Sequence, residues 1–141
     1  MITLSESQKF QILCILRDLA SVDHNLELVE AIRIRLIGLK MDLHEDTIEE
    51  ALAEDIRDIA ATLKCLAFFT QPEQKKYLYQ QCLLLLMADR EISGVEADAM
   101  EAIRVGLSLD RAFHDQIVAW VREGMEWERR GEDLVGGSLE E

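Results

Sequence analysis

The sequence is poor in proline, glycine and aromatic residues. It holds one proline, seven glycines, four phenylalanines, two tryptophans and two tyrosines among 141 residues. Because proline and glycine are the residues that interrupt helices, long helix-compatible runs remain. No segment alternates apolar and polar residues as a strand does, and no hairpin turn signal is present. These absences argue against a β fold and favour an all-α domain.

Basic residues are also scarce. Lysine and arginine number 15 against 28 acidic residues, which gives a formal charge of −13. Such a surface repels nucleic-acid phosphates and anionic membranes, whose binding needs clustered basic side chains. We therefore expect no nucleic-acid ligand and no membrane insertion. Cations and basic protein surfaces are the partners that this charge favours, and a homodimer is compatible with it.

Long hydrophobic runs and paired cysteines are missing as well. The longest apolar run, Cys82 to Ala88, is far too short to span a bilayer, and the N-terminus lacks the features of a signal peptide. The three cysteines are odd in number, have no C-x-x-C spacing and lie in apolar helical contexts: Cys14, Cys65 and Cys82. We expect reduced core cysteines in a cytoplasmic protein.

Nearly half of the residues are hydrophobic, which is enough for one buried core. Apolar residues at three- and four-residue steps predict a single bundle of about seven helices over residues 1–130, followed by a flexible acidic tail at 131–141. The predicted helices run from about Ser5 to Val22, Glu27 to Leu39, a short one from Asp46, Asp55 to Phe69, Thr70 to Met87, Gly94 to Val105, and Ser108 or Asp110 to Arg130.

The periodicity also predicts which side chains face the core. The helix that carries the Leu83–Met87 run is apolar all round and should be the most buried. Trp127 and Met125 could form an exposed contact patch. The side chains expected to point inward are Ile32, Leu36 and Leu39 in the second helix, Val95, Met100 and Ile103 in the sixth, and Trp120 in the last.

Two stretches share one layout, a helix, a short acidic turn and a second helix. One runs from Leu19 to Glu30 and the other from Cys82 to Glu96. The downstream glycines, Gly38 and Gly106, fall in near-equal places. We interpret the chain as two copies of one unit, in which Asp23 matches Asp89, Leu26 matches Ile92, Val29 matches Val95 and Glu30 matches Glu96.

The second turn does not form an EF-hand calcium loop. If Asp89 takes the fifth loop position and Glu96 the twelfth, the first and third positions fall on Leu85 and Met87, which offer no oxygen ligand. The sixth position, which needs glycine for the sharp turn, is Arg90.

The same residues resemble the hallmark of the TerB-like family, small all-helical proteins named for tellurite resistance. That hallmark is a helix ending in A-D-G-x-I, then serine or aspartate, two further residues and a glutamate. Here it corresponds to Ala88–Glu96, and a diverged copy surrounds Asp23 and Glu30. The resemblance spans about Phe10 to Trp120, with Arg90 in place of the usual glycine.

The resemblance implies a non-enzymatic bacterial protein of tellurite or metal-stress response. It also implies a metal ion on the acidic residues Asp23, Glu30, Asp89 and Glu96. If the two units pack about a pseudo-twofold axis, these carboxylates converge, and they then require a cation, a bound proton or basic neighbours. Oxygen ligands alone favour calcium, magnesium or manganese. His24, beside Asp23, is the one histidine worth testing as a further ligand.

A purely structural interpretation stands beside this one. Ser93 and Glu96 have capping-box spacing, so Glu96 can satisfy the amides of its own helix. Asp89 can cap its turn, and Arg90 can neutralise a carboxylate. The protein is then an acidic helical adaptor that docks a basic partner and has no metal site. We expect no enzyme in either case, because no nucleophile has a paired base.

Overall fold

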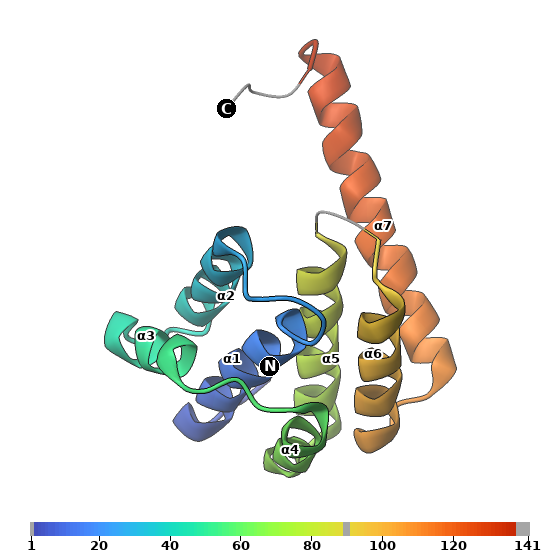
Figure 1. Cartoon of the computed structure of the whole chain (residues 1–141). Coiled ribbons are helices and arrows are strands. Elements are labelled where there is room, and N and C mark those ends of the chain that lie inside the picture. The colour runs from blue at the N-terminus through green and yellow to red at the C-terminus, as the bar shows by residue number, and fades with distance from the viewer. Residues whose placement is uncertain (1, 89–90, 138–141) are drawn as a thin grey trace.

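The computed structural model describes residues 2–88 and 91–137 (Figure 1). Over these residues the chain forms seven α-helices, one 3₁₀ helix and no strand, which confirms the predicted all-α bundle. The elements are α1 (Glu6–Ala20), α2 (Leu28–Lys40), α3 (Glu45–Ala53), α4 (Ile59–Lys64), η1 (Cys65–Phe68), α5 (Pro72–Met87), α6 (Gly94–Gly106) and α7 (Arg111–Leu134).

Several helix ends differ from the prediction. The fourth helix begins at Ile59 instead of Asp55, because the Asp58 side chain caps it by accepting a hydrogen bond from the Ala61 amide at 2.8 Å. After Lys64 the chain tightens into the 3₁₀ helix η1. The last helix continues past Arg130 to Leu134.

The predicted capping boxes at Ser5 and Ser93 are present, and each is closed by the side chain three residues later. At α5 the cap is Gln71, with Gln74 as the third helical residue, and not Thr70. The Gln74 Oε1 atom accepts hydrogen bonds from the amides of both Thr70 and Gln71, at 3.3 and 3.2 Å. Helix starts are therefore set by local side-chain-to-backbone hydrogen bonds.

The helices repeat with one constant register. We call residues 5–54 (α1–α3) the first unit and residues 71–137 (α5–α7) the second unit. Each helix of the second unit begins 66 positions after its counterpart: Glu6 and Pro72, Leu28 and Gly94, Glu45 and Arg111. The helix ends at Lys40 and Gly106 keep the same offset. The predicted duplication is therefore a duplication of backbone structure.

Equivalent side chains meet where the units cross. Gln8 and Gln74 exchange hydrogen bonds, Nε2 of each donating to Oε1 of the other at 3.0 and 3.3 Å. Such reciprocal contact between equivalent residues is the mark of a twofold relation. The glycines correspond only approximately, since Gly106, the last residue of α6, lies two positions past the equivalent of Gly38 in α2. The left-handed residues that follow these helices do match, Asp42 at φ 63° and Ser108 at φ 58°.

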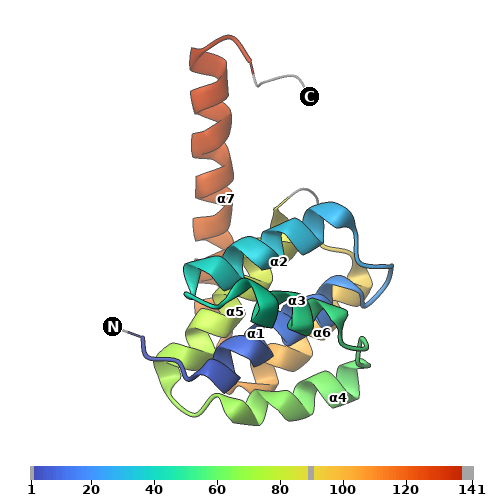
Figure 2. The same ribbon diagram turned by 90° about the vertical axis from the view of Figure 1, so that its left-hand side faces the viewer.

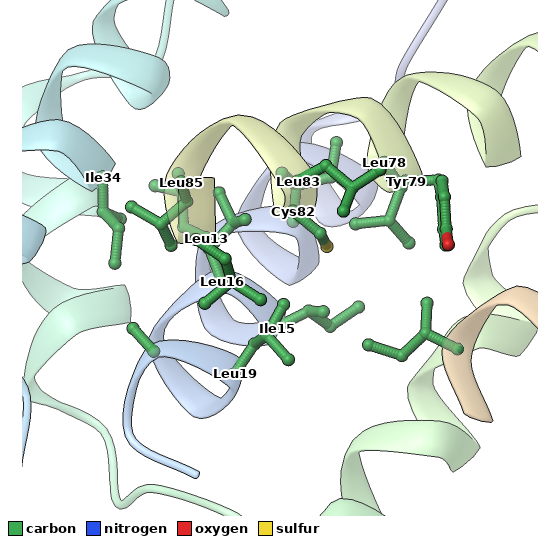
Figure 3. Close-up of a cluster of buried hydrophobic side chains, with 14 of the residues drawn as sticks. Leu13, Ile15, Leu16, Leu19, Ile34, Leu78, Tyr79, Cys82, Leu83 and Leu85 are labelled. Atoms are coloured by element: carbon green, nitrogen blue, oxygen red, sulfur yellow. The ribbon is translucent and has the colours of Figure 1, made fainter. Parts of the chain in front are cut away.

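Helix α1 is the centre of the bundle (Figure 2). It packs against α2, α3, α4, α5 and α6, and every residue from Ile12 to Ala20 is buried. Figure 3 shows its apolar side chains interleaved with those of α5. The expectation that α5 is the most buried helix was wrong, because Leu84 of its leucine run is only partly buried.

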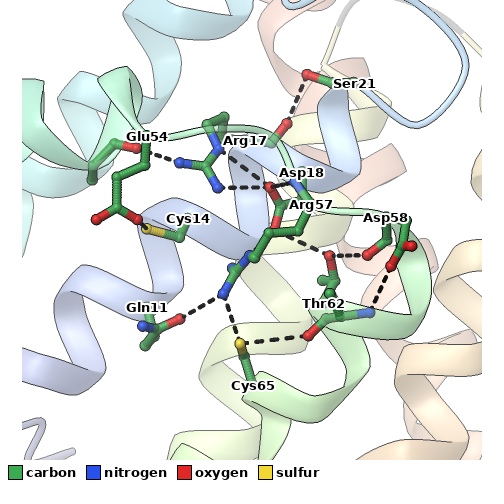
Figure 4. Close-up of polar contacts among 12 residues, drawn as sticks. Gln11, Cys14, Arg17, Asp18, Ser21, Glu54, Arg57, Asp58, Thr62 and Cys65 are labelled. Carbon is green, nitrogen blue, oxygen red and sulfur yellow. Dashed lines mark hydrogen bonds and ion pairs between the residues drawn. The ribbon is translucent and has the colours of Figure 1, made fainter.

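A buried ionic network fastens α4 to α1 (Figure 4). The Asp18 carboxylate accepts hydrogen bonds from Arg17 Nη2 at 2.7 Å, Arg57 Nε at 2.7 Å and the Thr62 hydroxyl at 3.0 Å. Arg17 also donates to the Ala51 carbonyl at 2.6 Å. Buried charges are tolerated only when they are paired in this way, so the network fixes α3 and α4 on α1.

The three cysteines are free thiols among the described residues. Cys14 and Cys82 are buried, as expected, and burial raises the pKa of their thiols to about 11 and about 12, while Cys65 is half-buried. No helix in the part of the chain that the structure describes is long and apolar enough to cross a bilayer.

Several side chains predicted to face the core point outward. Ile32, Leu36 and Leu39 are between 46% and 53% exposed, because α2 contacts the core through its opposite face, which carries Ile34 and Gly38. In α6, Val95 is likewise exposed, whereas Met100 and Ile103 are buried as predicted.

Trp120 in α7 also points outward, because its neighbour Val121 is the side chain of this helix that is buried. Figure 1 shows that this helix extends well beyond the bundle, so its outer turns have no core to face. Trp120 is 47% exposed and not a core residue. Trp127 and Met125 are exposed as predicted, at 71% and 42%.

Candidate metal centre

The first acidic turn is built between two helix ends. Helix α1 stops at Ala20, where the Ser21 hydroxyl donates to the Arg17 carbonyl at 2.9 Å. Helix α2 starts at Leu28, and the Glu30 carboxylate accepts from the Glu27 amide at 3.0 Å. The chain between these ends is therefore held at both sides, which fixes where its acidic side chains lie.

His24 lies between two carboxylates of this turn. Its Nδ1 atom is 2.6 Å from Asp23 Oδ1, and its Nε2 atom is 3.0 Å from Glu30 Oε1. Burial opposes protonation of the ring, but the hydrogen bonds to Asp23 and Glu30 outweigh it and raise the pKa of His24 above its ordinary value. An imidazolium can donate to both neighbours at once, so His24 supplies the positive charge that converging carboxylates require.

The second unit reaches the same place through Ser93. The Ser93 hydroxyl donates to Asp23 Oδ2 at 2.6 Å, across 70 positions of sequence. Glu96 is fully buried, and its carboxylate accepts from the Ser93 amide at 3.0 Å. The turn of the first unit and the start of α6 therefore meet, as the duplication predicted.

Three of the four predicted ligands thus gather around one histidine. Oxygen or nitrogen atoms of Asp23, His24 and Glu96 lie within 4.8 Å of one another, and a second such group joins His24 to Glu27 and Glu30. The fourth predicted ligand, Asp89, lies outside the described residues, as does Arg90. The metal ligands therefore remain a prediction, with His24 and Glu27 added to the set.

The structural interpretation is confirmed in one respect. Glu96 closes the capping box of α6, as was expected if its role were local. Glu30 does the same for α2, although its N-cap is Glu27 and not serine. Capping uses one carboxylate oxygen of each glutamate, so a capping role does not by itself exclude a ligand role.

His24 was recognised in the sequence only as a neighbour of Asp23, and Glu27 was not recognised at all. The contact of His24 with Glu30 spans six positions, which is not the three- or four-residue spacing of neighbours on a helix face. The Glu27-to-Glu30 spacing is that of a capping box with glutamate in place of serine, and this signal could have drawn attention to Glu27.

Comparison with known proteins supports the fold. No protein-family model matches the chain, and no curated protein matches its sequence. A solved structure does match: a tellurite resistance protein from Nostoc punctiforme superposes with a TM-score of 0.72 over 99% of this chain and 86% of that one, at 12% sequence identity. The chain therefore has the fold of a TerB-like tellurite resistance protein, as its A-D-x-x-I motif indicated.

Proposed function

We propose that this chain is a non-enzymatic protein of tellurite or metal-stress response that binds a divalent cation between its two acidic turns. The observation that carries the proposal is the contact of Asp23, His24 and Glu96, which brings donor atoms from both units within 4.8 Å. The fold shared with a tellurite resistance protein supports the biological setting.

The donor set bears on which ion would bind. Carboxylates alone suit calcium, magnesium and manganese, whereas an imidazole nitrogen favours zinc and related transition metals. His24 must lose its proton before it can ligate, so binding should release a proton and tighten as pH rises. The ion would then replace the imidazolium as the positive charge of the cluster.

A bound ion would link the first unit to the second. Asp23 belongs to the turn after α1 and Glu96 to the first turn of α6, so one cation on both would tie the two units together. A ligand that binds only the native state stabilises it by about 2.7 kcal/mol when its concentration is 100 times its Kd. A higher cation concentration would therefore stabilise the contact between the turn after α1 and the start of α6.

The test is titration calorimetry of the metal-free protein with manganese, zinc, calcium and magnesium. We expect Asp23→Asn and Glu96→Gln each to weaken binding at least tenfold, about 1.4 kcal/mol. The Glu96→Gln amide oxygen can still close the capping box, so the fold is preserved. Glu45→Gln, on the exposed start of α3, is the matched control and should bind like the wild type. Absence of heat with every ion, or equal binding by all variants, would refute the proposal.

The alternative of an acidic adaptor is favoured by a separate observation. The outer face of α2 carries exposed apolar side chains, which we call the α2 stripe: Leu28, Ile32, Leu36 and Leu39. A helix that is apolar on two opposite faces needs a second contact in addition to the core. With a net charge of −13, long-range attraction selects a partner that surrounds its apolar contact with basic residues.

Leu36→Glu tests the adaptor without touching the acidic turns. A basic partner captured by the wild type should be lost by Leu36→Glu and kept by Asp23→Asn. Light scattering on the same proteins measures self-association. If the wild type is a dimer and Leu36→Glu is a monomer, the α2 stripe is a homodimer contact. A partner that is retained by Leu36→Glu would contradict docking on the stripe.

A further inference from the structure

The outer half of α7 carries an apolar face that the rest of the described chain does not cover. Figures 1 and 2 show this helix continuing well past the ends of the other helices. Trp120, Trp127 and Leu134 are spaced seven positions apart, so they lie on one face of the helix, and all three are exposed. Large apolar side chains gathered on a face that projects into water mark a contact with another molecule.

Two glycines complete this face, which we call the α7 seam: Trp120, Gly124, Trp127, Gly131 and Leu134. The seam residues follow one another in steps of four and three, the spacing of a helix that pairs with another helix. A glycine inside a helix costs about 0.5–1 kcal/mol relative to alanine. A Cβ atom at Gly124 or Gly131 would have nothing within 4 Å, so no neighbour inside the molecule requires a glycine there. Side chains of a second molecule that approach the backbone closely would explain both glycines.

The opposite face of α7 is charged and paired within the helix. Arg129 forms ion pairs with Glu126 at 2.5 Å and with Asp133 at 3.4 Å, and all three side chains are exposed. Such a face is satisfied in water, so only the seam has apolar surface to bury. An apolar seam with a charged opposite face is the pattern of a helix that pairs along one side.

Two copies of the seam fit each other when the helices run antiparallel. If the twofold axis passes between residues 125 and 126, Trp120 of one copy lies over the partner's Gly131, and Trp127 lies over the partner's Gly124. This single register therefore places an indole ring over every glycine of both copies. A parallel pair would set tryptophan against tryptophan and glycine against glycine, which produces clashes and voids.

The charges beside the seam favour the same orientation. In the antiparallel register Glu123 of each copy lies beside the partner's Arg130, which gives two ion pairs across the contact. Within one helix these two residues lie about 10 Å apart along the axis, which is beyond the three- or four-residue spacing of helical ion pairs. In a parallel pair Glu123 would face the partner's Glu128, which is a repulsive contact.

We propose that two copies of this chain associate through the α7 seam as an antiparallel helix pair. Each end of the contact is closed by Leu134, which lies near the partner's Ile117, an apolar residue that is only partly buried in its own bundle. An aromatic side chain buries about 150–250 Å². A contact built on four tryptophans therefore covers on the order of 1,000 Å², the size of a reversible dimer. The seam shares no residue with the Asp23–His24–Glu96 cluster or with the α2 stripe, so this proposal is independent of both functions proposed above.

The experiment is sedimentation velocity of the full chain over a series of concentrations. The wild type should dimerise reversibly as its concentration rises. Gly124→Leu places a side chain where the partner's Trp127 would lie and should weaken the dimer about tenfold or more, although leucine favours a helix more than glycine does. Ala119→Leu is the matched control, because it adds the same side chain at an exposed position outside the seam, and it should dimerise like the wild type.

Charge exchange tests the orientation of the two helices. Glu123→Arg and Arg130→Glu should each weaken self-association about tenfold, because each variant sets like charges side by side twice. An equimolar mixture of the two variants should recover the affinity of the wild type, since every arginine then faces a glutamate. In a parallel pair Glu123→Arg would instead strengthen association, because it would face Glu128 of the partner subunit.

Two variants outside the seam separate this contact from the other proposals. Asp23→Asn and Leu36→Glu should both dimerise like the wild type. The proposal is overturned if the wild type stays monomeric, if Gly124→Leu dimerises as well as the wild type, or if Leu36→Glu breaks a dimer that Gly124→Leu keeps. Stronger association of Glu123→Arg, or no gain on mixing the two charge variants, would overturn the antiparallel register.

Discussion

The two units of this chain have the same backbone plan and different interiors. Caps, helix starts and the left-handed residues after α2 and α6 repeat at a constant spacing. The side chains inside do not repeat. Leu83 and Leu84 of the second unit take the positions of Arg17 and Asp18 in the first, and the 24-residue α7 takes the place of the nine-residue α3. Local hydrogen bonds at helix ends thus persist when packing diverges, because they depend on a few residues and not on the whole core.

The two units also differ in the surfaces that they present. The first unit closes its core and presents the α2 stripe outside, whereas the second unit leaves a cavity inside and extends α7 into solvent (Figure 1). The acidic cluster lies where the two meet, since it takes Asp23 from the first unit and Glu96 from the second.

The largest effect is expected from the ionic network of the first unit. Asp18→Ala leaves Arg17 and Arg57 without their buried carboxylate, and should lower the free energy of unfolding by about 3–5 kcal/mol. Urea denaturation measures this loss.

The sequence of the second unit suggests a control for the Asp18→Ala variant. The double variant Arg17→Leu/Asp18→Leu installs the residues of the second unit and removes both charges of the buried pair. It should lose less stability than Asp18→Ala, because the buried Arg17 charge is removed too and only the half-buried Arg57 is left without its carboxylate. A double variant as unstable as the single one would mean that the two interiors are not interchangeable.

The two faces of α2 should respond very differently to truncation. Ile34 is fully buried, so Ile34→Ala should cost about 2–5 kcal/mol through lost contacts and a cavity. Leu36 is 53% exposed, so Leu36→Ala should change stability by about 0.5 kcal/mol or less. Thermal or urea unfolding of both variants checks this, and equal losses would contradict the outward orientation of the stripe.

A smaller effect is expected at the close approach of α2 and α3. A Cβ atom on Gly38 would lie 2.8 Å from Ile48 Cγ1, so Gly38→Ala should strain the packing by about 1–3 kcal/mol. A gain of about 0.5–1 kcal/mol from better helix propensity offsets part of that cost.

A double-mutant cycle isolates the strain. The Ile48→Ala background removes the two closest contacts of the added methyl group and leaves Leu13 Cδ1 at 3.1 Å, so Gly38→Ala should cost clearly less there. If Gly38→Ala costs the same in both backgrounds, Ile48 is not the cause.

The smallest effect concerns pH and the His114 position, where the first unit has Ile48. Burial lowers the pKa of His114 below its ordinary value of 6.5, and the Tyr79 hydroxyl lies 2.6 Å from its Nδ1 atom. As pH falls below 6.5 the unfolded chain takes up a proton before the folded chain does, so stability should decline. The charged groups that act on this ring are Asp115, Arg111, Glu101 and Arg104.

Replacing His114 tests whether this side chain causes the loss of stability at low pH. In His114→Ile the free energy of unfolding should fall less steeply between pH 6.5 and the pKa of His114 in the folded chain. Above pH 7 the pH dependence of the variant should match that of the wild type. Unfolding curves at several pH values measure the slope. An unchanged slope in the variant would assign the acid sensitivity to other groups.

Much of the helical layout could be predicted from the sequence because its signals are local. Ser5 with Gln8, and Ser93 with Glu96, are capping boxes in the structure as in the sequence. The shared acidic layout predicted the duplication for a similar reason. The helix end predicted at Val22 was placed less well, and the start of the fourth helix was assigned to Asp55 although its cap is Asp58.

Orientation could not be predicted in the same way. Helix α2 has apolar residues on two opposite faces, and periodicity cannot say which one meets the core. Ile32, Leu36 and Leu39 were therefore assigned to the wrong side. Trp120 was misplaced for the same reason, since the neighbouring Val121 is the side chain of α7 that is buried.

The sequence by itself determined the all-α class, most helix starts, the duplicated acidic turns and the acidic surface. Each of these depends on residues within a few positions or on composition. Only the tertiary structure decided that His24 bridges Asp23 and Glu30, that Ser93 reaches Asp23, and that the second unit keeps a cavity. These contacts join residues whose spacing in sequence has no helical or strand meaning, so only packing could bring them together.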